Sequence, residues 1–412
     1  MSAGLTLRVF LPFALGYYLS YVYRAINAVI APDLVRDLSL DAGELGLLTS
    51  TYFLTFAAIQ LPLGVMLDRA GPRKTETALL VIAAMGAAVF ASASSLTGLA
   101  VGRGLVGLGV SACLMAGITA FAHWFPKERL AFSNGCLFTA GGLGAISATA
   151  PVEAALAVTD WRGVFYALAA ATLVAAATIF FIVPERAQTP AGHAAKTPAL
   201  GRQIAEMKQI VAHPMFIRFV PLAVMTQSAN LSMPTLWAGP WLTDVAGLSR
   251  EETATALLLI ATGLMAGFFS MGLIAERLQR RGIDTAATTV GFSIAYLLVQ
   301  LVLILGIADA PRSLWVLFAF TGTTGSLSYA ALSQQFPAAL AGRVNTVLNL
   351  FVFLGAFAAQ WGIGVIINQW PVSADGHFAS EGYTAAFAAM LALQVAGLAW
   401  IPLARLQNRR TA

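Results

Sequence analysis

Long apolar stretches recur about every 30 residues along the whole chain, and they reach the length of about 20 residues that a helix needs to cross a bilayer. Hydrophobic residues make up 58% of the chain and charged residues only 10%. A water-soluble core could not bury so much apolar surface. We therefore predict an all-α membrane protein with twelve transmembrane helices, at residues 9–31, 45–66, 75–96, 98–122, 131–156, 162–183, 215–242, 252–275, 286–308, 312–334, 343–368 and 383–404.

The basic residues orient these spans, because cytoplasmic loops hold most of the Lys and Arg of a membrane protein. With both termini inside, 18 of the 24 basic residues fall in the cytoplasm. Two further arginines lie within spans, and four fall on the outer side of the membrane, namely Arg36, Arg162, Arg250 and Arg312. We expect a multi-pass protein of a bacterial cell (inner) membrane with both termini cytoplasmic. The net charge of +5 follows from this asymmetry and does not indicate a nucleic-acid partner.

The chain also repeats itself. The segment "GVMLDRAGPRK" begins at Gly64, and "GLIAERLQRRG" begins at Gly272, which is 208 residues later. The glycine, the acid and the following arginine coincide. We therefore expect two six-helix bundles, at residues 1–186 and 214–412, joined by a polar cytoplasmic linker at 187–213. A monomer is the default for this arrangement.

The first of these segments resembles the loop signature of the major facilitator superfamily, in its usual place between the second and third helices. The segment "RGLVGLG" from Arg103 resembles a second motif of that superfamily, with Val106 in place of the usual glutamine. Together with twelve spans, two halves and a linker, these motifs identify the chain as similar to that superfamily over its whole length. The resemblance implies a secondary transporter whose halves rock around a site near the middle of the membrane.

The resemblance also implies a conformational role for the repeated loops. Asp68 would sit at the positive N-terminus of the span 343–368 in the outward-facing state, and Glu276 would do the same at the span 131–156. Such contacts break when the halves rock. The alternative is that the basic residues of these loops only set the topology. The candidate conformational residues are Gly64, Asp68, Arg69, Gly71, Arg73, Glu276 and Arg277.

Two permanent charges lie inside spans. Arg24 and Arg103 fall in the spans 9–31 and 98–122, which in the superfamily fold would line the central cavity. The sequence places no acidic residue near the middle of a span, because Glu76, Glu153 and Asp244 all lie close to span ends. A guanidinium binds carboxylate, sulfonate or phosphate by two points, which makes an anionic substrate the expected partner. The alternatives are that Arg24 snorkels outward or bonds backbone carbonyls, and that Arg103 serves coupling or packing.

The segment "YRAINAVIAP" resembles, more loosely, the first-helix pattern of anion:cation symporters and related organic-anion carriers, in which an Asp-Arg pair precedes an asparagine. Tyr23 stands here in place of the aspartate. If that acid carries the coupling proton in the group, this chain lacks that route. Exchange of one anion for another, or a proton carried on the substrate itself, then becomes more plausible.

Helical spacing supplies further cavity candidates. Tyr17 and Asn27 share a face with Arg24, while the other candidates lie on the spans 215–242 and 312–334. Small hydroxyl residues in membrane helices commonly pack or bond the backbone, and tryptophans near span ends commonly anchor the interface. The candidate substrate-binding residues are Tyr17, Arg24, Asn27, Arg103, Gln227, Asn230, Trp237, Ser328 and Tyr329.

We predict a secondary active transporter of a small organic or inorganic anion, with a coupling ion or counter-substrate as further partner. The alternative is a drug/proton antiporter, although the glycines of "TAGGLGAISATAP" lack the Gly-Pro motif typical of that class. An enzyme is not expected, because the four histidines lie at span ends or in loops. A transporter-like sensor is a further alternative. We expect no cofactor and no metal.

Overall fold

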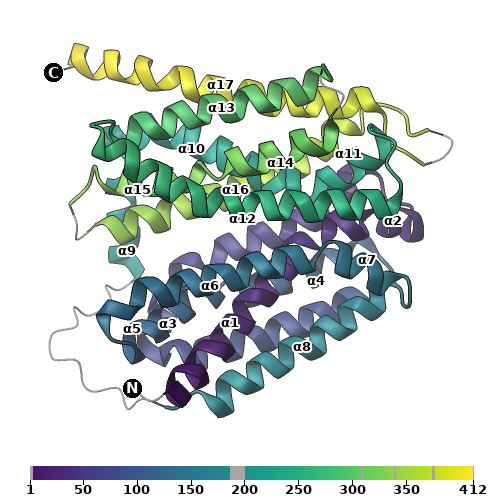
Figure 1. Ribbon diagram of the computed structural model, residues 1–412, viewed down its shortest axis with the longest axis horizontal. Helices are drawn as coiled ribbons and strands as arrows, with labels where there is room; N and C mark the ends of the chain where they lie inside the picture. The colour runs from purple at the N-terminus through teal and green to yellow at the C-terminus, as the bar shows by residue number, and fades with distance from the viewer. Residues whose placement is uncertain (1–2, 186–199, 308–309, 338–339, 374–375, 412) are drawn as a thin grey trace. The chain divides into compact units, whose positions relative to one another are not determined.

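A computed structural model describes residues 3–185, 200–307, 310–337, 340–373 and 376–411, and these residues form helices and connecting turns without a strand (Figure 1). They fall into two compact units. The first unit comprises residues 1–26 and 51–203, and the second comprises residues 27–50 and 204–412. The chain therefore passes from one unit to the other near residues 26, 50 and 203. Residues 187–199 of the linker expected at 187–213 lie outside the described residues, and residues 200–211 form the helix α9, Leu200–Val211.

The first unit is built from α1 (Ala3–Ala25), most of α3 (Ala42–Ser92), α4 (Leu96–Val110), α5 (Cys113–Trp124), α6 (Lys127–Ser147), α7 (Ala150–Leu156) and α8 (Trp161–Ile182). The second unit contains α2 (Asn27–Leu38), the first residues of α3, most of α9, α10 (Pro214–Ser232), the π-helical turn η1 (Met233–Trp237), α11 (Ala238–Asp244), α12 (Arg250–Arg280), α13 (Thr285–Leu305), α14 (Pro311–Gly322), α15 (Gly325–Ser333), α16 (Ala341–Ile367) and α17 (Ser380–Thr411).

Eight helical segments of the described chain are long and apolar enough to cross a membrane. One of them, α3, contains two of the expected spans, because the backbone turns at Gly71 with a φ of 78°. A glycine adopts this left-handed conformation without steric cost. Five other expected spans are interrupted, as α1 with α2, α4 with α5, α6 with α7, α10 with η1 and α11, and α14 with α15. The all-α membrane fold predicted from the sequence is confirmed.

Breaks occur in the expected spans 9–31, 98–122, 131–156, 215–242 and 312–334. Local residues account for two of them. Pro234 lies in the π-helical turn η1, and a proline cannot donate a helical hydrogen bond. At the α14–α15 break, the Thr323 hydroxyl donates to the Phe320 carbonyl at 2.7 Å, and the Thr324 hydroxyl donates to the Thr321 carbonyl at 2.6 Å. Such bonds compete with the helical ladder and bend it.

Glycines allow the helices of the first unit to touch backbone to backbone. A Cβ at Gly102 would lie 2.6 Å from the Phe90 nitrogen, and a Cβ at Gly107 would overlap the Tyr52 carbonyl. The glycines of "GLAVGRGLVGLG" therefore permit close helix approach. The contact fixes α4 against both halves of α3.

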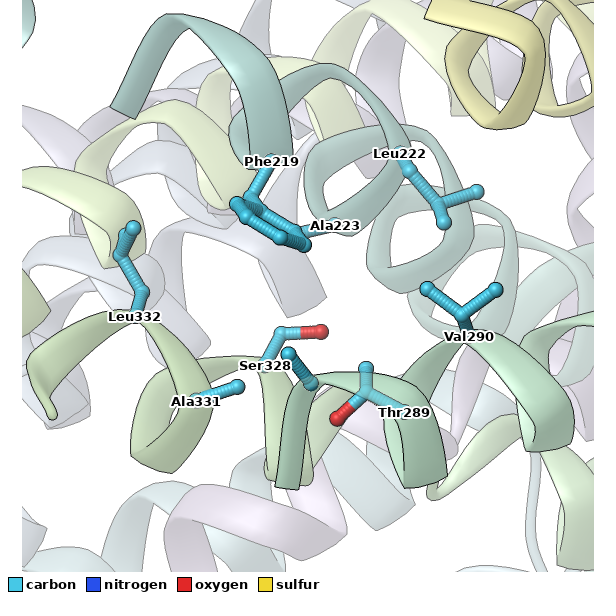
Figure 2. A pocket seen from close by; sticks show the side chains of 9 residues that line it. Phe219, Leu222, Ala223, Thr289, Val290, Ser328, Ala331 and Leu332 are labelled. Carbon is cyan, nitrogen blue, oxygen red and sulfur yellow. The ribbon is translucent and has the colours of Figure 1, made fainter. Parts of the chain in front are cut away.

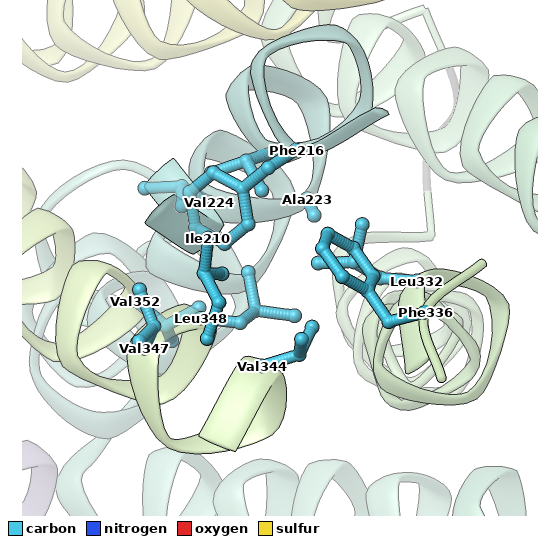
Figure 3. Close-up of a cluster of buried hydrophobic side chains, with 11 residues drawn as sticks. Ile210, Phe216, Ala223, Val224, Leu332, Phe336, Val344, Val347, Leu348 and Val352 are labelled. Carbon is cyan, nitrogen blue, oxygen red and sulfur yellow. The ribbon is translucent and has the colours of Figure 1, made fainter. Parts of the chain in front are cut away.

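The second unit has an apolar cluster that ties α9 and α10 to α15 and α16 (Figure 3). Phe216 and Phe336 are the two largest buried side chains of this cluster. The remaining members are Ile210, Val220, Ala223, Val224, Leu332, Val344, Val347, Leu348 and Val352. α9 therefore packs as part of this unit.

Candidate functional site

Arg24 lies near the end of α1 in an aromatic setting. Its guanidinium carbon is 4.7 Å from the centre of the Tyr21 ring and 5.5 Å from that of Phe56. Tyr52 and Tyr17 are further neighbours of the guanidinium. Aromatic faces attract a cation without neutralising it, and phenol hydroxyls add neutral hydrogen-bonding groups. The first unit thus surrounds this half-buried charge with neutral phenols and an apolar ring.

Tyr17 is held firmly beside this arginine. Its ring packs edge-on against Tyr21 at 5.1 Å and against Phe138 at 6.3 Å between centroids. Gly141 on α6 leaves the space for the ring, because a Cβ there would lie 2.6 Å from Tyr17 Cε1. The expected neighbourhood of Tyr17 and Arg24 is therefore present in the structure.

Arg103 is enclosed, with 1% of its surface exposed. Its Nη1 atom donates to the Tyr23 carbonyl at 3.1 Å, which ties α4 to α1. The guanidinium also lies 5.2 Å from the Tyr52 ring centre. Its Nε atom is buried and has no hydrogen-bond partner among the described residues. Arg103 therefore has a packing contact and one unused donor.

Tyr52 is the residue of this region that sequence reasoning missed. It is 1% exposed and it neighbours both Arg24 and Arg103. Two guanidinium groups near one phenol give this part of the first unit a positive potential. The tyrosine lies on a different helix from either arginine, so spacing within one helix could not reveal it.

In the second unit, Gln227 and Asn230 of α10 pack against the break between α14 and α15. A Cβ at Gly325 would overlap the Gln227 side chain, and a Cβ at Gly322 would overlap Asn230 Oδ1. That oxygen is buried without a hydrogen-bond partner among the described residues. The structure thus packs both amides against the buried turn of backbone between α14 and α15.

Ser328 and Tyr329 point to different neighbours. Ser328 lines a pocket among α10, α13 and α15 that is mostly apolar, with Phe219, Leu222 and Val290 in its wall (Figure 2). The Tyr329 hydroxyl instead donates to Asn349 Oδ1 on α16 at 2.9 Å. Consecutive helical residues point about 100° apart, so these two candidates do not share a face.

Trp237 and Asn27 belong to a tightly packed part of the second unit. The Trp237 Nε1 atom donates to the Gln360 carbonyl at 3.1 Å, and the Gln360 amide donates to the Thr49 hydroxyl at 2.8 Å. Trp237 is fully buried, and this hydrogen bond occupies Nε1, the only donor of its side chain. Asn27 is 2% exposed, and its Oδ1 atom lacks a partner in the described part of the chain. It groups with the second unit, whereas Arg24 groups with the first.

The same part of the second unit contains a two-point ion pair. Arg250 donates from Nη1 to Asp33 Oδ1 at 2.9 Å and from Nη2 to Asp33 Oδ2 at 2.6 Å. The Asp33 side chain is 7% exposed, while that of Arg250 is 42% exposed. The pair fixes α2 to the start of α12.

The candidate conformational residues of the first repeat lie around the turn at Gly71 within α3. Asp68 and Arg69 are exposed beside the turn at Gly71. Gly64 has open space around it. Arg73 donates to the Phe180 carbonyl at the end of α8 and pairs with Glu185 at 3.6 Å, where Lys74 also pairs at 2.7 Å.

In the repeated loop, Glu276 pairs with Arg280 at 2.6 Å, one turn along its own helix, and Arg277 is exposed. Both charged loops are accordingly exposed within their own units. Groups of three or more metal-ligating side chains are not found among the residues described.

The family profile of the Major Facilitator Superfamily matches residues 13–360. The chain belongs to this superfamily. It is therefore a multi-pass membrane protein of a transporter family, as the sequence motifs predicted.

Curated relatives within the Major Facilitator Superfamily are distant. A probable sulfoacetate transporter of Cupriavidus necator is 29% identical over 159 residues, which cover 39% of this chain and only 37% of that protein. The chain thus matches little more than a third of that relative's length. A hexuronate transporter of Bacillus subtilis is 24% identical over 390 residues, 91% of each chain. A chloramphenicol resistance protein of Streptomyces lividans is 29% identical over 252 residues, 61% of this chain and 62% of that one.

A solved structure of a bacterial homologue of the human lysosomal transporter Spinster, in an inward-facing and occupied conformation, is also similar. It has a TM-score of 0.77 and 18% identity over 98% of both chains. This likeness shows that the fold is that of the Major Facilitator Superfamily.

Proposed function

We propose that this transporter carries a small anion bearing a carboxylate or sulfonate group, and that Arg24 binds it. The observation that carries the proposal is the setting of Arg24 among Tyr17, Tyr21 and Tyr52. A half-buried guanidinium beside phenol hydroxyls can offer an anion two parallel donors and neutral hydrogen bonds around them. Arg103, which shares Tyr52 as a neighbour, adds positive potential to the same region.

The relatives support this chemistry. By name, one carries sulfoacetate and another carries a hexuronate. Both compounds present an oxyanion that fits a guanidinium fork. Gln227 and Asn230 of the second unit are proposed to orient the rest of such a substrate, because hydroxyl-rich anions need neutral hydrogen-bonding partners as well as a charge.

Transport is proposed to occur by alternating access of two halves, residues 1–186 and 214–412, in a bacterial inner membrane with both termini cytoplasmic. Asp68 and Glu276 are the proposed latches on one conformation. Asp68→Asn is expected to shift the equilibrium toward the inward-facing state. Cysteine accessibility on the two membrane faces would measure this shift, and unchanged accessibility would count against the latch.

The substrate proposal is tested by a thermal-shift screen of the purified protein. Sulfoacetate, glucuronate, nitrate, chloramphenicol and lipophilic cations serve as probes, each on wild type, Arg24→Gln and a control, Arg36→Gln, whose side chain is 67% exposed. A ligand at 100 times its Kd stabilises a protein by about 2.7 kcal/mol. We expect one class of anion to stabilise wild type and the control but not Arg24→Gln. An anion effect that survives Arg24→Gln would remove Arg24 from the site.

Export of lipophilic drugs is the second candidate. It is favoured by the similarity to a chloramphenicol resistance protein and by the mostly apolar pocket around Ser328. Stabilisation by chloramphenicol or lipophilic cations, equal in wild type and Arg24→Gln, would support export. It would also make Arg24 structural.

A further inference from the structure

Glu76 is an acid buried inside the first unit. It lies on α3 five residues after the turn at Gly71, and 0% of its surface is exposed. Neither of its carboxyl oxygens has a hydrogen-bond partner among the described residues. An unpaired carboxylate in such a place costs far more than a neutral acid does. The side chain is therefore a protonated carboxylic acid in this conformation.

The sequence itself makes room for this acid. α1 passes the carboxyl at Gly16, where a Cβ would overlap the Glu76 Oε1 atom. α5 contributes Cys113, which is fully buried and is the titratable neighbour that acts on Glu76. The thiol and the carboxyl make no hydrogen bond of normal geometry. A site that keeps a glycine and a small thiol around an unpaired acid is shaped for that acid.

Glu76 is connected to the proposed anion site through its neighbours. Cys113 is a neighbour of both Glu76 and Arg24, and Tyr17 is a neighbour of both Cys113 and Arg24. The titratable and charged groups facing the acid are therefore Cys113 on α5 and, beyond it, Tyr17 and Arg24 on α1.

We propose that Glu76 is a proton-binding site that couples anion transport at Arg24 to the movement of one proton. This inference rests on the proposed function of Arg24. In the symporter pattern the aspartate lies on the first helix, where this chain has Tyr23. Glu76 lies on a different helix, α3.

Electrostatics gives the coupling its direction. An anion bound at Arg24 cancels positive charge near the cluster, which favours the protonated acid over its carboxylate. By reciprocity, a proton on Glu76 favours anion binding to the same degree. Anion and proton are thus loaded together. In a conformation that admits water to Glu76, the O–H bond breaks, the proton passes to water, and the remaining carboxylate weakens anion binding at Arg24.

The experiment uses the full chain in proteoliposomes with labelled glucuronate and sulfoacetate. Two rates are compared for each variant, namely accumulation driven by a pH gradient and exchange of labelled for unlabelled anion without a gradient. We expect Glu76→Gln to lower gradient-driven accumulation by about tenfold or more, while exchange stays within about twofold of wild type. Glu76→Asp keeps a titratable group and should retain part of the accumulation. Glu185→Gln removes an exposed carboxylate of the same unit and should change neither rate.

Gradient-driven accumulation by Glu76→Gln at the wild-type rate would overturn the proposal. Failure of the proposed function has a different signature, since Arg24→Gln would then leave both rates intact. If neither probe is transported, infrared spectroscopy of the purified protein decides the matter without a substrate. A carbonyl band of a protonated carboxylic acid, present at neutral pH in wild type and lost in Glu76→Gln, supports the site, and identical spectra refute it.

Discussion

The candidate residues of the two units differ in the chemistry that they present. The first unit offers two guanidinium groups around Tyr52, held by helices in backbone contact through glycines such as Gly107. The second unit offers the neutral amides of Gln227 and Asn230 against a broken helix. The proposed function assigns recognition of charge to the first unit and orientation of the substrate to the second. Each prediction below would break or sharpen that division.

Arg24→Lys should have the largest effect. Lysine keeps the positive charge but loses the planar fork, so one of two charge-assisted hydrogen bonds to an oxyanion disappears. Such a bond contributes roughly 1.5–3 kcal/mol, which corresponds to about a 10- to 100-fold weaker Kd. Calorimetric titration with the anion found in the thermal-shift screen would measure it. An unchanged affinity would show that charge alone is recognised.

Gly107→Ala should destabilise the first unit, because the new Cβ would overlap the Tyr52 carbonyl, which cannot move without its helix. Overpacking of this kind costs about 1–3 kcal/mol. Gly325→Ala in the second unit meets only the Gln227 side chain and should cost less. Gly291→Ala, with open space around it, is the matched control. Thermal unfolding in detergent would give the order, and equal costs at Gly107 and Gly325 would contradict the comparison.

Gln227→Ala and Asn230→Ala should each weaken anion binding by roughly 2- to 10-fold, as expected for loss of one neutral hydrogen bond of about 0.5–1.5 kcal/mol. The loss should be larger for hydroxyl-rich glucuronate than for sulfoacetate. Titration of both anions on both variants would test this. A loss as large as that of Arg24→Lys would mean that the second unit carries recognition too.

Glu185→Gln should have the smallest effect and should depend on pH. The hydrogen bond and charge of Lys74, followed by the charge of Arg73, lower the pKa of Glu185 below its usual 4.5. The carboxylate therefore stabilises the fold above the usual pKa, and this contribution is lost as the pH falls through the lowered value. Melting temperatures of wild type and variant should differ slightly at pH 7 and converge in acid. Because the pair is exposed, salt should also remove the difference.

Composition, span length and the repeated loops were enough to predict the fold, because they depend on patterns along the chain. Only some of the neighbours of Arg24 could be predicted from the sequence. Tyr17 shares its helix and could be found by spacing, whereas Tyr52 reaches it from another helix. Glu76 was placed near a span end, and the sequence could not show that Gly16 opens a space that buries it. Ser328 and Tyr329 were both predicted as cavity residues because they are adjacent in the chain, but in the structure they contact different neighbours.

The ion pair between Asp33 and Arg250 has a consequence for biosynthesis. Its partners are 217 residues apart, so a ribosome adding 5–20 residues per second needs roughly 10 to 40 s to supply Arg250 after Asp33 has emerged. The segment 27–50 belongs to the second unit and is made before residues 204–412, which form the rest of that unit. The membrane insertion machinery must therefore hold a hairpin with a charged aspartate at its end until most of the chain has been made.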